Sequence, residues 1–212
     1  MSNKLNIIFD LDGTLADTAV LTMKAFENLA HLYGLPVPSM ETIRRAMGYQ
    51  NPEFYNHIYP NEPEESVRLL GERVETEEQR LLPAFKADFL FPGVRELLAE
   101  LKILNYPMHI ASTGSEDHVY SILNKEGIKE FFTKVVCDKP VKTGMIAEII
   151  GSGAKEDFIM VGDMKKDIEG AKANGIIIIG ACYGYAQKDS GFDMYIDTPA
   201  ELLDIIKNIE KN

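Results

Sequence analysis

Five short apolar segments, each neighboured by a segment with helical spacing, constrain the fold of this 212-residue chain more than any other feature. The apolar segments are continuous rather than alternating, which is typical of strands buried on both faces of a parallel sheet. They cover residues 5–9, 108–111, 134–137, 158–161 and 176–179, and helix-like segments follow residues 93, 115, 143, 164 and 198. This alternation predicts an α/β fold with a Rossmann-like, doubly wound parallel sheet.

Residues 18–88 interrupt the alternation, because they contain helix-like patterns and no convincing strand. Two apolar helix faces are marked by Ala25, Phe26, Leu29 and Leu32, and by Val67, Leu70, Val74 and Leu81. The glutamates between Glu62 and Glu78 are interpreted as the solvated face of a helix. We therefore expect a core domain, residues 1–17 and 89–212, that carries an inserted all-helical domain, residues 18–88.

Two carboxylates, those of Asp10 and Asp12, directly follow the first apolar segment. Alternate residues of a strand share a face, so both leave the strand on one side. Buried unpaired charge is costly, whereas a bound divalent cation would satisfy both groups. A calcium loop requires glycine at its sixth position and glutamate at its twelfth, but here Gly13 is fourth and Leu21 is twelfth. The spacing excludes that loop and favours a site for phosphate chemistry.

The segment from Phe9 to Thr18 resembles the first signature of the haloacid dehalogenase-like hydrolase superfamily, most of whose members are magnesium-dependent phosphatases. The resemblance covers the whole chain, and the tail, including Tyr183-Gly184-Tyr185, is similar to phosphoglycolate phosphatase-like members. It implies that residues 18–88 form a helical cap that closes over the active site. Three further signatures are expected in order along the chain.

The second signature, a hydroxyl at the end of the next core strand, corresponds to Ser112-Thr113-Gly114. An N-cap for the following helix is an equally good interpretation of Ser112, since the same geometry serves both roles. The third signature is a lysine, and either Lys139 before Pro140 or Lys142 at a helix start can supply it. We prefer Lys142; the alternative for each lysine is a position on the surface.

The fourth signature corresponds to Gly162-Asp163, followed by Asp167 at a helix start. A helix start favours negative charge, which is a sufficient structural reason for Asp167. Asp163 would lie beside Asp10 across neighbouring strand ends, and two such carboxylates repel each other unless a cation bridges them. Ligation by oxygen alone points to Mg²⁺.

The resemblance implies a mechanism as well as a site. Asp10 would be the nucleophile that forms an aspartyl-phosphate, Asp12 the general acid and base, and Ser112 and Lys142 the other catalytic residues. The expected metal ligands are Asp10, Asp12, Asp163 and Asp167; the expected phosphate-binding residues are Ser112, Thr113, Gly114, Lys142 and Lys139; and Arg45 and Tyr49 are candidates for substrate specificity.

The substrate is expected to be a small-molecule phosphate monoester, with phosphoglycolate as the first candidate. A β-phosphoglucomutase-like phosphomutase is an alternative, because protonating and deprotonating a sugar hydroxyl would use the same Asp12. A pyrophosphatase is a further alternative, because the sequence leaves the substrate open. Dehalogenase activity is disfavoured, since it does not need Asp12. A phospho-acceptor signalling protein is the non-enzyme alternative, but such domains are small and do not carry an insertion like residues 18–88.

Charge and cysteine content restrict the partners and the compartment. A net charge of -11 argues against binding to nucleic acids or anionic membranes. Only two cysteines, Cys137 and Cys182, are present and no apolar run is long enough to span a membrane, so we expect a cytoplasmic protein. Both a monomer and a homodimer are compatible with the sequence.

Overall fold

The computed structural model describes residues 4–47, 49, 51–188 and 190–211, which form two compact units. One unit comprises Met1–Asp17 and Leu90–Asn212, and the other Thr18–Phe89. The chain leaves and rejoins the first unit at adjacent points: Ala16 forms an antiparallel bridge with Leu90, and the Phe91 N–H donates to the Leu15 carbonyl over 3.1 Å.

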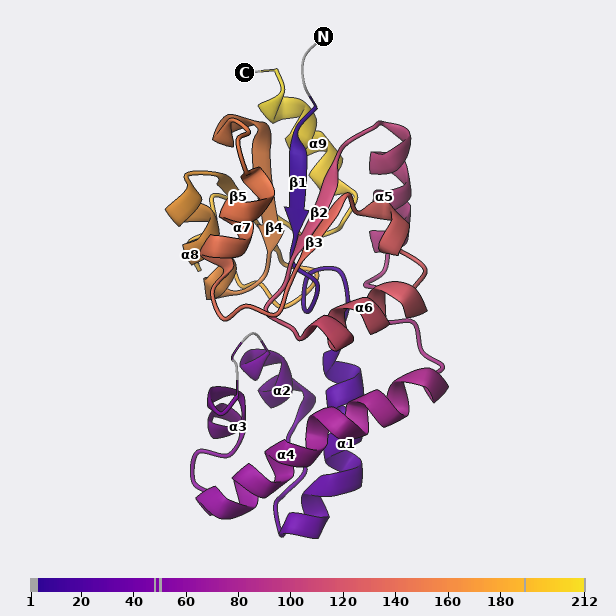
Figure 1. Ribbon diagram of the computed structural model, residues 1–212, viewed down its shortest axis with the longest axis vertical. Helices are drawn as coiled ribbons and strands as arrows, with labels where there is room; N and C mark the ends of the chain where they lie inside the picture. The colour runs from indigo at the N-terminus through magenta and orange to yellow at the C-terminus, as the bar shows by residue number, and fades with distance from the viewer. Residues whose placement is uncertain (1–3, 48, 50, 189, 212) are drawn as a thin grey trace. The chain divides into compact units, whose positions relative to one another are not determined.

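The first unit is built around a parallel six-stranded sheet (Figure 1). Its strands are β1 (Asn6–Phe9), β2 (Met108–Ala111), β3 (Lys134–Val136), β4 (Phe158–Gly162), β5 (Ile177–Ala181) and β6 (Met194–Ile196). They lie in the order β3-β2-β1-β4-β5-β6, and all five adjacent pairs are parallel. This is a Rossmann-like doubly wound sheet, and the predicted fold class is confirmed.

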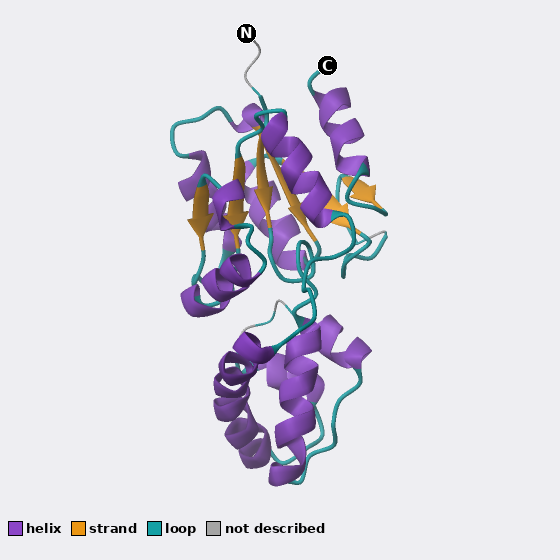
Figure 2. Ribbon diagram, turned by 90° about the vertical axis from the view of Figure 1, so that its right-hand side faces the viewer, coloured by secondary structure: helices purple, strands orange, loops and turns teal. Residues whose placement is uncertain are grey.

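Helices cover both faces of the sheet (Figure 2). They are α5 (Val94–Ile103), α6 (Glu116–Lys125), α7 (Lys142–Ile150), α8 (Lys165–Asn174) and α9 (Glu201–Ile209), with one-turn 3-10 helices η3 (Lys129–Phe131) and η4 (Lys155–Asp157). Ile8 and Met160 pack with α7 and α8 in one apolar cluster. Ile7 and Phe9, which flank Ile8 in β1, point to the opposite face and are also fully buried. Burial on both faces explains why these strands are continuous apolar segments.

Helices are the only regular secondary structure among the described residues of the second unit. It contains α1 (Ala19–Leu29), η1 (Ala30–Tyr33), α2 (Met40–Ala46), α3 (Glu53–Ile58), α4 (Glu64–Leu81) and η2 (Leu82–Ala84). Aromatic side chains fill its centre, where the Phe26 ring lies 6.4 Å from that of Phe54 and 5.9 Å from that of Tyr59. Aromatic pairs at this separation add to the stability that burial provides.

Three details differ from the sequence prediction. The sequence pattern predicts Leu32 on an apolar helix face, but its side chain is 64% exposed, because the α-helix ends at Leu29 and the tighter 3-10 spacing of η1 changes the face. Glu77 and Glu78 are not simply solvated: they accept hydrogen bonds from Asn28 and Thr22 of α1 over 2.7 and 2.5 Å. The short strand β6 was not predicted.

Candidate active site

The candidate site lies at the carboxyl ends of β1 and β4, where the strand order reverses direction along the chain. Asp10 follows β1, and its N–H donates to the Val161 carbonyl of β4 over 3.0 Å. Asp163 follows β4 directly. Doubly wound sheets bind ligands in the crevice at this switch point. The backbone therefore brings the two carboxylates together although they are 153 positions apart in the sequence.

Lys142 joins Asp10 to Asp167. Its Nζ lies 2.6 Å from Asp10 Oδ2 and also contacts Asp167 Oδ1, and the three side chains are all buried. The other Asp10 oxygen, Oδ1, accepts from the Leu11 N–H over 2.8 Å. Lys142 is the first residue of α7, so the start of this helix places the ammonium within the cluster.

Asp167 fixes the loop between β4 and α8. Its Oδ2 accepts hydrogen bonds from the backbone N–H groups of Asp163, over 3.0 Å, and Met164, over 2.9 Å. Glycine is required at position 162, because a Cβ there would collide with the Asp167 side chain. Both oxygens of Asp167 are thus engaged by Lys142 and by this loop, which accounts for its complete burial.

Asp163 has one satisfied and one unsatisfied oxygen. The Thr14 hydroxyl donates to Oδ1 over 2.6 Å, whereas the buried Oδ2 has no hydrogen-bond partner among the described residues. Gly13 has a positive φ of 81°, and a Cβ at this position would collide with the Asp163 carboxylate and the Tyr185 ring. The loop after β1 can therefore approach Asp163 only with glycine there.

The electrostatics of the cluster reflect an excess of carboxylates. Burial raises the pKa of Asp10 to about 7, although the Lys142 charge opposes this shift. Burial and the charges of Asp10 and Asp167 raise the pKa of Asp163 well above its ordinary value. Burial acts to lower the pKa of Lys142, but the charges of Asp10 and Asp167 outweigh it and raise that pKa. One ammonium does not compensate three carboxylates.

These residues fit a divalent cation with hard ligands. Asp10, Asp163 and Asp167 each offer an oxygen, and these oxygens lie within 4.8 Å of one another. The unsatisfied Asp163 Oδ2 is the observation that fits a metal best, since an unpaired buried carboxylate oxygen is costly. A donor set made only of oxygens suits Mg²⁺. Asp167 offers its oxygens less directly, because both already accept hydrogen bonds.

Ser112 and the residues after it form the loop at the end of β2. Ser112 is 1% exposed, and its Oγ accepts from the Gly114 N–H over 3.1 Å. The helix α6 is capped instead by Ser115, whose Oγ accepts from the His118 N–H over 3.3 Å. Ser112 is therefore not the N-cap of α6, which was the alternative interpretation that the sequence left open. Thr113 is half-buried in the same loop.

Asp12 does not belong to the carboxylate cluster around Lys142. Its Oδ1 lies 2.8 Å from Nε2 of His118, in the first turn of α6. Both side chains are mostly buried, with 16% and 24% exposure. Sequence reasoning did not identify His118, since the two residues are 106 positions apart and no motif links them. Thr14, which it also did not single out, lies within the motif that carries Asp10.

Three other predicted site residues lie elsewhere. Lys139 is half-exposed and pairs with Glu148 over 2.5 Å, outside the buried cluster. Arg45, on α2, is 70% exposed at its side chain and pairs with Glu41 over 2.5 Å. The Tyr49 ring is exposed and stacks on the His57 ring at a centroid distance of 3.9 Å. Arg45 and Tyr49 both belong to the helical unit.

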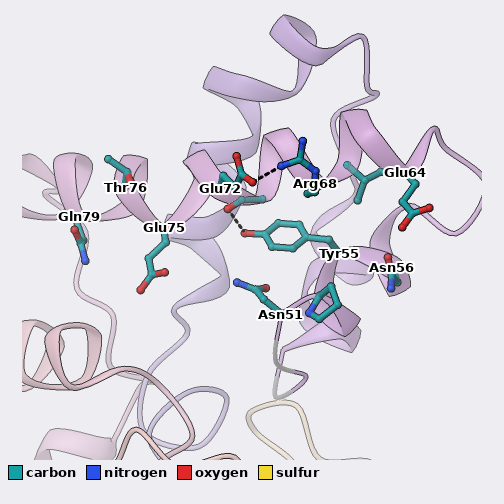
Figure 3. Close-up of a pocket in the computed structure, with 12 residues that line it drawn as sticks. Asn51, Tyr55, Asn56, Glu64, Arg68, Glu72, Glu75, Thr76 and Gln79 are labelled. Carbon is teal, nitrogen blue, oxygen red and sulfur yellow. Dashed lines mark hydrogen bonds and ion pairs between the residues drawn. The ribbon is translucent and has the colours of Figure 1, made fainter.

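The helical unit has a pocket of its own, with a volume of about 660 Å³. Figure 3 shows Tyr55 at its floor and an ion pair between Arg68 and Glu72 at its edge. The Tyr55 hydroxyl donates to the Gly71 carbonyl over 3.3 Å. Three glutamates, Glu64, Glu72 and Glu75, belong to its largely exposed polar lining, and neither Arg45 nor Tyr49 lines this pocket.

The family of the chain follows from a comparison with known proteins. Residues 7–181 match the haloacid dehalogenase-like hydrolases, and the chain belongs to this family. The expectation drawn from the motifs at Asp10, Ser112, Lys142 and Asp163 is thereby confirmed at the level of the family. The chain is an enzyme of the hydrolase class.

Two kinds of curated relative are similar to the chain. Phosphoglycolate phosphatase of Synechococcus elongatus is 28% identical over 96% of this chain and 97% of its own length. Tyrosine-protein kinase PtkA of Mycobacterium tuberculosis is also 28% identical, over 86% of this chain. The aligned region spans 64% of the length of PtkA.

Solved structures support the same fold. A haloacid dehalogenase-like hydrolase from Streptococcus pneumoniae superposes with a TM-score of 0.82 and 25% identity over 97% of this chain and 99% of its own. A predicted phosphoglycolate phosphatase from Haemophilus somnus gives a TM-score of 0.83 at 21% identity over 97% and 99%. Among the described residues, no helix is long and apolar enough to span a membrane.

Proposed function

We propose that the chain is a magnesium-dependent phosphatase that hydrolyses a small-molecule phosphate monoester through an aspartyl-phosphate on Asp10. The observation that carries this proposal is the buried contact of Asp10 with Lys142, 2.6 Å long, beside the unsatisfied Asp163 oxygen at the switch point. A buried ion pair of this kind adds little to stability, so a catalytic role explains it better.

The first step forms a bond between an Asp10 oxygen and phosphorus and breaks the bond from phosphorus to the ester oxygen. Asp12 gives the leaving oxygen a proton. In the second step Asp12 takes a proton from water, whose oxygen attacks phosphorus and releases Asp10 and inorganic phosphate. Lys142 stabilises the negative charge on Asp10 and on the phosphoryl oxygens. Each step thus has a donor or acceptor among residues of this chain.

Ser112, Thr113 and Gly114 are proposed to bind the phosphoryl oxygens, because a hydroxyl and backbone N–H groups before a helix suit an anion. Asp10, Asp163 and the Asp12 carbonyl would hold Mg²⁺, and Asp167 would orient Lys142 and the metal-binding loop. Bound Mg²⁺ would supply positive charge for the phosphoryl oxygens. Lys139 takes no part in this proposal, since it pairs with Glu148 at the surface.

Phosphoglycolate is the proposed substrate, supported by the name of the relative that aligns over 97% of its own length. We further propose that residues 18–88 act as a cap and that Arg45 and Tyr49 contact the substrate. Pyrophosphate and sugar phosphates remain the alternatives to test. A cytoplasmic location and a monomeric or homodimeric state remain predictions.

Phosphate release from phosphoglycolate, pyrophosphate, nucleoside monophosphates and sugar phosphates, with Mg²⁺ or with EDTA, tests the proposal. We expect turnover only with Mg²⁺, and a loss on the order of 10⁴-fold or more in Asp10→Asn. Asp204→Asn, an exposed site on α9, is the matched control and should retain activity. Undiminished turnover in Asp10→Asn would refute the nucleophile, and full activity in EDTA would refute the metal.

A further inference from the structure

The imidazole of His118, which contacts Asp12, is held in position by neighbouring groups. The His118 N–H is tied to the cap residue Ser115, which sets the first turn of α6. The imidazole lies over Gly114, where a Cβ would be 3.0 Å from His118 Cδ2. Its Nε2 then meets Asp12 Oδ1 at 2.8 Å. The position of the ring is therefore determined by backbone on one side and by the aspartate on the other.

A carboxylate oxygen can only accept at this contact, so His118 Nε2 carries the shared hydrogen and donates it. This hydrogen bond restricts the rotation of the Asp12 carboxylate about its side-chain bonds. Proton transfer to a leaving group requires a well-defined orientation, and a displacement of about 1 Å can cost roughly 100-fold in rate.

We infer that His118 is a positioning residue that acts through Asp12, fixing the general acid and base by a hydrogen bond from the first turn of α6. This inference rests on the proposed phosphatase function. His118 does not contribute to the cluster of Asp10, Lys142, Asp163 and Asp167, so its effect should be confined to the step that depends on Asp12.

Two substrates with different leaving groups separate positioning from a general structural effect. An alkyl phosphate releases an alkoxide that needs a proton from Asp12, whereas p-nitrophenyl phosphate releases a stable phenolate that does not. The ratio kcat/KM reports only the steps through aspartyl-phosphate formation, so the later hydrolysis does not affect it. A defect in folding or binding of the phosphoryl group would reduce this ratio equally for both substrates.

In His118→Leu we expect kcat/KM for the alkyl phosphate to fall roughly 10- to 100-fold, and that for the aryl phosphate to fall less than about 3-fold. His118→Gln keeps an N–H donor at a similar reach and should restore most of the loss. Asp117→Ala, an exposed change in the same helix turn, is the control for the helix start. Equal losses for the two substrates, or no loss for either, would overturn the inference.

The double variant Asp12→Asn, His118→Leu provides a second test on the alkyl phosphate. If His118 acts through Asp12, its loss should have no further effect once Asp12 is replaced. Multiplied losses would overturn the inference while leaving the phosphatase function intact. Absence of Mg²⁺-dependent turnover by the unaltered protein on both substrates would overturn the proposed function, and this inference with it.

Discussion

The two units of the chain place their charged side chains in opposite environments. At the strand ends of the α/β unit, Lys142 is 3% exposed and its partner Asp167 is fully buried. In the helical unit, Arg45 and its partner Glu41 are 70% and 72% exposed. Exposed pairs contribute at most about 1 kcal/mol to stability, whereas a buried charge costs several unless it is well paired. Ion pairs of similar length therefore differ in their effect on the stability of the fold, according to how deeply they are buried.

The buried pairs are better explained by chemistry than by stability. Burial, together with the negative charge of Asp167, raises the pKa of Asp10 to about 7 even though the Lys142 ammonium opposes this shift. Such an arrangement destabilises the folded chain unless a cation or a ligand offsets it. The exposed pairs of the helical unit impose no comparable cost. Substitutions in the two units should therefore differ by an order of magnitude in their effects.

Lys142→Met should have the largest effect on stability. It leaves Asp10 and Asp167 buried without their ammonium partner, which typically costs about 3–5 kcal/mol. We also expect turnover to fall by on the order of 10²-fold or more, because the charge near the phosphoryl group is lost. Urea denaturation in EDTA measures the first effect. Lys165→Met, 86% exposed on α8, is the matched control, and a loss as small as in that control would contradict the prediction.

A second prediction concerns His109 on β2, which is buried and whose Nε2 lies 3.1 Å from Asn6 Oδ1. Burial lowers the pKa of His109 to about 4, from 6.5 in the unfolded chain. The unfolded state therefore binds more protons between these values, so stability is lost as pH falls from about 6.5 to about 4.

In His109→Gln this loss should disappear. Between pH 6.5 and pH 4, the decrease in the free energy of unfolding should be smaller in the variant than in the unaltered protein, by about 2 kcal/mol. Denaturation at a series of pH values measures it. His31→Gln, at an exposed histidine of the helical unit, serves as the matched change. An unchanged pH dependence in His109→Gln would show that the histidine is not the group responsible.

The smallest effect is expected at Arg68, whose pair with Glu72 on α4 is exposed on both sides. Arg68→Ala should change the free energy of unfolding by no more than about 0.5 kcal/mol. The comparison variant is Arg80→Ala, because its partner Glu77 is only 12% exposed and also binds Asn28. A loss above about 1 kcal/mol at Arg68 would remove the contrast between the two units.

The fold was predictable because a strand buried on both faces requires a continuous apolar segment, and five of the six strands have one. Strand β6, Met194–Ile196, lies between Asp193 and Asp197 and carries too short a signal, whereas β3, the other edge strand of three residues, contains two adjacent valines. The position of Asp10 next to Asp163 was expected from the first and fourth family signatures, each of which follows an apolar segment, and the strand order of the structure places the two strand ends side by side.

Residues that depend on side-chain direction could not be resolved in this way. Lys139 and Lys142 are three positions apart, and the sequence left both open; only the start of α7 places Lys142 in the buried cluster. The position of His118 is still more difficult to predict, because its partner Asp12 is remote in the chain and the sequence of its own helix contains no recognisable motif. Such contacts are set by how a loop and a helix pack, and no local pattern records them.

The bridge between Ala16 and Leu90 closes the backbone of the α/β unit at the point where the helical unit is inserted. Because the two points where the chain departs and returns are already joined by backbone hydrogen bonds, an inserted segment does not itself have to bring its ends together. The entropy of closing a loop rises only slowly with its length. The length of the inserted segment can thus vary at this position with little entropic cost while Asp10, Lys142 and Asp163 keep their places in the α/β unit.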